Sequence, residues 1–115
     1  MIDVNEVVRR VLKEIPDIKV TYYHPSAFND MPIVSYYELV TTTGMCYDNA
    51  EQAQNSSVAI DVWGKSTAEC GRIAIDIDKA MQDNGWYRDF SRDMPPEDNI
   101  YHKTMRFKKE IFKEE

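Results

Sequence analysis

Residues 58–70 of the chain, VAIDVWGKSTAEC, combine the patterns of a strand, a turn and a helix start. Branched apolar residues occupy every second position from Val58 to Val62, which is typical of a strand with one face against a core. Gly64 interrupts the alternation. Ser66 and Glu69 then form a capping box, in which each side chain accepts a hydrogen bond from a backbone amide at the helix start. A strand that leads directly into a helix favours a fold in which helices pack on a sheet.

Two apolar stripes at helical spacing predict helices over residues 3–15 and 67–84. Asp3 is the expected N-cap of the first helix, and Pro16 cannot continue it. Gly85 is expected to end the second helix in a left-handed conformation. The expected core residues of the two helices are Val4, Val7, Val8, Val11, Leu12 and Ile15 in the first, and Cys70, Ile73, Ala74, Ile77 and Met81 in the second.

Runs rich in β-branched and aromatic residues predict four strands, within IKVTYYHP, PIVSYYELVTTT, VAIDVW and IYHKTMRFKKEIF. Residues 44–56 and 88–99 lack periodicity, so they are expected to form mobile loops, and the charged tail KKEIFKEE is expected to fray. The predicted fold is α+β, with two helices packed on a mostly antiparallel sheet of about four strands in the order α-β-β-β-α-β. A chain of 115 residues is expected to form one domain, residues 1–115.

Composition excludes several classes of function. The net charge of −6 disfavours general nucleic-acid binding, which requires basic surface. The sequence shows neither a long apolar run nor the pattern of a signal peptide, so no membrane association is expected. Cys46 and Cys70 lack the spacing of a zinc site and are expected to stay as free thiols in a reducing cytoplasm.

The sequence predicts no catalytic, cofactor-binding or metal-binding residues, and hence no enzyme. Nothing in the sequence places His24 or His102 beside a nucleophile, so both are expected to be solvated surface residues. Asp76 and Asp78 point about 200° apart around their helix, which disfavours a metal site shared with Asp61. With few glycines and no phosphate-binding loop, a binding or assembly module is the expected class.

Four segments in this order resemble the tail terminator, or tail completion (tail-to-head joining), proteins of long-tailed bacteriophages and prophages: MPIVSYYE (31–38), IDVWGKS (60–66), IDIDKAMQDNGWYRDF (75–90) and YHKTMRF (101–107). The resemblance implies a structural protein that forms a homo-oligomeric ring, a hexamer, on the end of the tail tube. This ring would stop tube polymerisation and bind the head connector protein, while DNA passes through it without specific binding. The resemblance also implies a place in the virion tail and assembly in the cytoplasm of the bacterial host.

The two aperiodic segments are the candidate contacts to the tail tube protein, the connector or other ring subunits, because long loops often carry binding surfaces. The alternatives are that these segments are idle surface loops, or that the chain is a small monomeric enzyme or ligand-binding α+β domain with an apolar pocket. The candidate contact residues are Asp48, Asn49, Glu51 and Gln52 in the first segment and Asp89, Asp93, Glu97 and Asp98 in the second.

Overall fold

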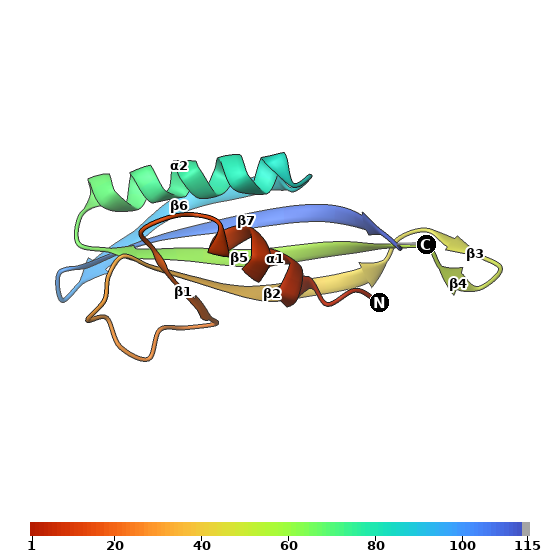
Figure 1. Cartoon of the computed structure of the whole chain (residues 1–115), viewed down its shortest axis with the longest axis horizontal. Coiled ribbons are helices and arrows are strands. Elements are labelled where there is room, and N and C mark those ends of the chain that lie inside the picture. The colour runs from red at the N-terminus through yellow and green to blue at the C-terminus, as the bar shows by residue number, and fades with distance from the viewer. Residues whose placement is uncertain (114–115) are drawn as a thin grey trace.

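The computed structural model describes residues 1–113 and has two helices on one face of an antiparallel-rich sheet (Figure 1). Within these residues, a five-stranded sheet has the order β1-β2-β5-β7-β6, and a separate hairpin pairs β3 with β4. Strands β1 and β2 are parallel, whereas the other neighbours are antiparallel. The elements are α1 (Val4–Lys13), β1 (Lys19–Tyr22), β2 (Ile33–Thr43), β3 (Cys46–Tyr47), β4 (Ala50–Glu51), β5 (Ala53–Gly64), α2 (Thr67–Asp83), β6 (Tyr87–Glu97) and β7 (Ile100–Phe112).

The α+β class and both helices are confirmed, but the predicted strand number and order are wrong. The order α-β-β-β-α-β omits β6 as well as the β3–β4 hairpin. Strand β6 has the sequence YRDFSRDMPPE and is exposed at every position except Met94, which is partly buried. It lies at the edge of the sheet and pairs with β7 alone, so its residues need not be apolar. Its two prolines fall where the pairing with β7 is irregular, and such positions tolerate proline.

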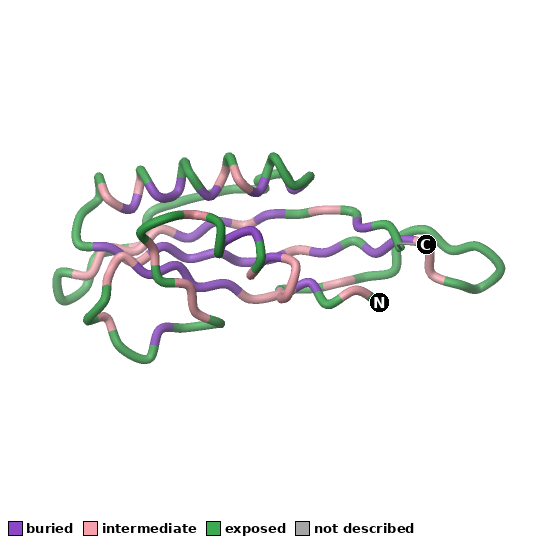
Figure 2. Tube along the Cα trace, viewed as in Figure 1, coloured by how far each residue is buried: buried purple, intermediate pink, exposed green. Residues whose placement is uncertain are grey.

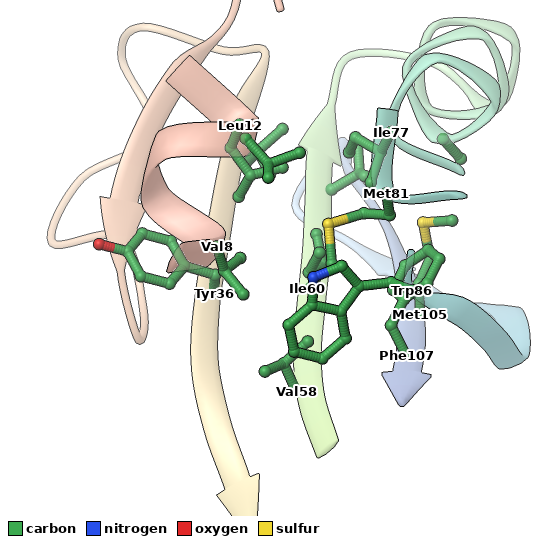
Figure 3. Close-up of a cluster of buried hydrophobic side chains, with 14 of the residues drawn as sticks. Val8, Leu12, Tyr36, Val58, Ile60, Ile77, Met81, Trp86, Met105 and Phe107 are labelled. Atoms are coloured by element: carbon green, nitrogen blue, oxygen red, sulfur yellow. The ribbon is translucent and has the colours of Figure 1, made fainter. Parts of the chain in front are cut away.

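One hydrophobic core joins both helices to the sheet. Figure 3 shows Val8 and Leu12 of α1 and Ile77 and Met81 of α2 meeting strand residues such as Ile60. The stripes predicted from the sequence account for the helical half of this core, although Val7 and Ile15 are only partly buried. The strands and the α2–β6 connection supply Val34, Tyr36, Val58, Ile60, Val62, Trp86, Met105, Phe107 and Ile111.

The helix ends follow local backbone chemistry with two differences from prediction. Asp3 occupies the N-cap of α1, although its side chain accepts no capping hydrogen bond from the described residues. At α2 the Glu69 amide donates to Ser66 Oγ at 3.1 Å, as predicted, but Glu69 Oε1 accepts from the amide of Lys65 at 2.9 Å rather than from that of Ser66. Gly85, with φ of 87°, follows α2 in the left-handed region, as predicted.

The molecule is elongated, measuring 53 × 24 × 24 Å. Strands β2 and β5 extend past the helices to the exposed β3–β4 hairpin at one end, and the β6–β7 turn lies at the other end (Figures 1 and 2). Strand β7 continues through Phe112, so the segment expected to fray from residue 108 is largely a strand. Residues 114 and 115 of that segment lie outside the described residues.

Candidate functional site

The sheet face turned away from the helices carries a groove of about 270 Å³, here called the open-face groove. Cross-strand pairing explains its composition, because residues of β2, β5, β7 and β6 that lie side by side in the sheet point to this face together. The lining residues are Tyr23, His24, Tyr37, Asp61, Trp63, Phe90, Arg92, Met94, His102, Thr104 and Arg106.

A hydrogen-bonded aromatic stack forms the floor of the groove. The rings of Trp63 and His102, which are cross-strand neighbours, stack at 3.7 Å with an interplanar angle of 14°. His102 Nε2 lies 2.9 Å from Asp61 Oδ1, and Trp63 Nε1 donates to Ser35 Oγ at 3.0 Å. These bonds satisfy Trp63 Nε1 and His102 Nε2 and hold the two rings in one orientation.

The structure corrects the prediction for the histidines. His102 has a side chain only 19% exposed, so it is not a solvated surface residue. His24 is exposed, as predicted, but its ring packs edge-on against Trp63 at 5.1 Å. Phe28 approaches the same indole at 5.2 Å. Both histidines therefore lie against Trp63. His102 does so through the pairing of β5 with β7, and His24 does so because the segment after β1 folds over the end of β5.

Two arginines and two tyrosines form the walls of the groove. Arg106 lies over the ring of Phe90, with its guanidinium carbon 5.6 Å from the ring centre, a cation–π arrangement. Arg106 Nη1 also donates to Thr104 Oγ1 at 2.7 Å, and Arg92 Nη2 lies 3.5 Å from Met94 Sδ. The tyrosine rings, from Tyr23 and Tyr37, stack at 4.7 Å. The groove thus combines flat aromatic surfaces with guanidinium groups, which suits a partner with carboxylates and an aromatic side chain.

A second hollow of about 510 Å³ continues the open-face groove toward the β6–β7 turn. The two hollows share His24, Trp63, Met94 and His102. The walls of the second hollow include Glu97 and Asp98, so the surface changes from cationic to acidic along its length.

Four of the candidate contact residues lie on or beside the β3–β4 hairpin, and the prediction of a mobile loop over residues 44–56 is wrong. Asp48 and Asn49 form its two-residue turn with φ of 51° and 64°. This left-handed pair matches the right-handed twist of the strands. Glu51 is in β4, and Gln52 links β4 to β5.

The other four candidates lie on β6 and its turn, so the expected loop over residues 88–99 is wrong as well. Asp93 pairs with Lys103 at 3.0 Å, and Asp89 lies 3.6 Å from Lys108. Both pairs are cross-strand contacts at the exposed sheet edge and add little stability. Glu97 pairs with Ile100 across the turn that contains Asp98. The two groups of candidates do not converge. The first lies at the β3–β4 hairpin, whereas in the second Glu97 and Asp98 lie at the β6–β7 turn, at the opposite end of the molecule (Figure 1), and Asp89 and Asp93 lie along β6 between the two ends.

The remaining reactive groups are not assembled with the groove. Burial raises the pKa of the Cys70 thiol above its ordinary value, and this thiol points to the backbone oxygen of Tyr101 at 3.4 Å. Cys46 is exposed on the distant hairpin. Among residues 1–113, no three histidine, cysteine or acidic side chains are grouped as metal ligands would be. No helix in this part of the chain is long and apolar enough to span a membrane.

No known family model matches the chain, and no curated protein matches it significantly in sequence.

Sequence reasoning did not identify the open-face groove. The signal was nevertheless present in the residues between the predicted core positions. His102, Thr104 and Arg106 alternate with Met105 and Phe107 along β7, so they occupy the opposite face of the same strand. That alternation shows which residues share a face, but the groove also needs residues of β6, whose sequence lacks the periodicity of a strand.

Proposed function

We propose that this chain is a structural subunit of a phage tail terminator ring, which stops polymerisation of the tail tube and provides the interface for the head connector. The observation that carries the proposal is the separation of the β3–β4 hairpin, which holds four candidate contact residues, from the β6–β7 turn, which holds Glu97 and Asp98. A subunit that joins two different partners along one axis needs a contact surface at each end. An elongated α+β body of 53 Å with an exposed turn at either end meets this requirement.

The acidic character of the chain also supports the proposal. A ring on the end of a tail tube encloses the path of the DNA, and basic residues on that path would bind phosphate and slow its passage. With a net charge of −6 per subunit, the assembled ring would repel DNA on average. This property favours passage without specific binding.

The proposal is tested by removing the hairpin without unfolding the sheet. Gly44 N donates to the oxygen of Ala53 at 2.8 Å, so residues 45–52 can be replaced by an Asn-Gly turn that joins these two positions. Gln54 must be kept, since it is buried and exchanges hydrogen bonds with the backbone of Ile2 at 2.8 and 3.1 Å.

The expected variant is folded but fails to cap tail tubes. Electron microscopy of tails assembled with it should show tubes of uncontrolled length that do not join heads, as in preparations without the protein. Circular dichroism and thermal unfolding provide the control for folding. A folded variant that still produces joined tails of normal length would overturn the role of the hairpin. Tails of normal length that form when this protein is left out would overturn the proposed function.

A monomeric ligand-binding domain is the second candidate function, and the open-face groove favours it. Aromatic rings with a few convergent polar groups are the usual composition of a small-molecule site. Mass measurement separates the two candidates. A ring subunit forms multimers in solution or on tail tubes, whereas a ligand-binding domain of this kind stays monomeric in both settings.

A further inference from the structure

The open-face groove holds two guanidinium groups without acidic partners. Arg9, Arg10 and Arg88 each form an ion pair with a carboxylate, whereas Arg92 and Arg106 form none within residues 1–113. The acidic residue in the lining, Asp61, is already bound to His102. In a chain with an excess of acidic residues, two unpaired arginines in one groove mark a site for a carboxylate that this fold does not supply.

The β3–β4 hairpin presents matching groups at the far end of the molecule. The tip residue Tyr47 is 72% exposed, and Met45 beside it is about half exposed. Asp48 follows Tyr47 in the turn, and its carboxylate forms no ion pair with any residue that the structure describes. An exposed aromatic ring next to an unpaired carboxylate is the combination that the groove can bind.

The β3–β4 hairpin cannot reach the open-face groove of its own chain. Strand β5 runs without a break from Ala53, next to the hairpin, to Trp63 in the groove. Ten residues of extended strand separate these positions by about 33 Å, and the nearer groove residues Tyr37 and Arg106, which pair with Ala59, lie about 20 Å from Ala53 along the sheet. The central position of β5, between β2 and β7, prevents it from folding back. The partner for the groove is therefore on another molecule.

We propose that the hairpin tip of one copy of this chain binds in the open-face groove of the next copy. The carboxylate of Asp48 pairs with Arg92 and Arg106, and the ring of Tyr47 packs on the stacked pair of Tyr23 and Tyr37. This inference rests on the proposed function, since it supplies the contact between subunits of the ring. The two surfaces differ and lie apart on each chain, so the contact is head-to-tail and closes into a ring when the rotation per subunit allows.

A double-mutant cycle on the full chain tests the contact. Asp48→Asn removes the charge and keeps a residue that tolerates the left-handed conformation, while Arg92→Gln removes a guanidinium from an exposed position. The matched controls are Asp17→Asn, at an exposed aspartate with φ of 62° before β1, and Arg72→Gln, an exposed arginine on α2. Self-association is measured by sedimentation over a concentration series, in solution and again with purified tail tubes.

Each groove or hairpin variant is expected to raise the dissociation constant of self-association about tenfold, and the double variant no further than one single variant. The two controls should leave that constant unchanged. Tyr47→Ser should weaken self-association in the same way, whereas Tyr87→Ser, at an exposed tyrosine on β6, should not. Circular dichroism spectra serve as the control that every variant is folded.

Several results would overturn the proposed contact. One is strictly additive effects of Asp48→Asn and Arg92→Gln, and another is an unaltered dissociation constant in either variant. The third is the absence of any multimer both in solution and on tail tubes. Rings that form normally from the variants, on tails of controlled length, would refute this contact and leave the proposed function standing. If groove variants alone impair tail assembly, the groove binds a different partner.

Discussion

Ile75 and Ile77 lie two residues apart on α2 but in opposite environments, so they form a matched pair for testing the helix face. Ile77 is 0% exposed and belongs to the hydrophobic core, whereas Ile75 is 71% exposed. Truncating Ile77 to alanine removes a fully buried side chain and leaves a cavity. The expected loss is about 2–5 kcal/mol of unfolding free energy.

Replacing Ile77 by aspartate should cost more, because a carboxylate would lie among apolar side chains without an ionic partner. Such a buried, unpaired charge adds several kcal/mol to the loss of packing, so the total is comparable with the whole stability of a small domain, about 5–15 kcal/mol. Ile75→Asp changes a solvated position and should alter the unfolding free energy by less than about 0.5 kcal/mol.

Urea unfolding followed by circular dichroism measures these differences. Ile77→Ala should lower the denaturation midpoint with little change in the slope, and Ile77→Asp should be largely unfolded without denaturant. Ile75→Asp should unfold like the parent protein. Equal midpoints for Ile77→Ala and Ile75→Asp would refute the assignment of the buried face of α2.

Four further predictions concern the junction of β5 and α2 and the two thiols. Ser66→Ala removes the oxygen that accepts from the Glu69 amide, so the unfolding free energy should fall by about 1 kcal/mol in a denaturant titration. Gly64→Ala would place a Cβ atom 2.9 Å from Cys70 Sγ, so thermal unfolding should reveal a loss of about 1–3 kcal/mol; a melting temperature at or above that of the parent would contradict this packing. In the native protein, thiol reagents should label exposed Cys46 much faster than buried Cys70. Burial raises the pKa of the Cys70 thiol above its value in the unfolded chain. The contribution of the neutral thiol to stability is therefore complete below about pH 8.5 and is lost as the pH rises through the folded pKa. Cys70→Ala should reduce this loss of unfolding free energy at alkaline pH.

The missed hairpins show which local signals were present in the sequence. Both turns consist of an Asp-Asn pair, Asp48-Asn49 and Asp98-Asn99, and all four residues have positive φ. Asp and Asn tolerate this conformation and favour two-residue hairpin turns. The flanking segments had too little apolar periodicity to be recognised as strands, because neither β6 nor the β3–β4 hairpin contributes to the core.

The open-face groove could not be predicted from local sequence patterns, for a different reason. Trp63 and His102 are 39 positions apart in the chain, and they stack only because β5 and β7 pair in one particular register. A shift of one residue in that register would turn either side chain to the opposite face. The register depends on the whole sheet, so no single segment of the sequence reveals it.

The sequence by itself determined the features that depend on periodicity and on local hydrogen bonding: the two helices, the cap at Ser66, the stop at Gly85 and the apolar face of β5. These follow from residues within a few positions of one another, where side-chain spacing and capping act. Only the tertiary structure decided the strand order, the edge position of β6 and the composition of the groove. Those features arise from pairing between distant segments, whose free energy comes from burying the combined apolar surface of several strands and helices.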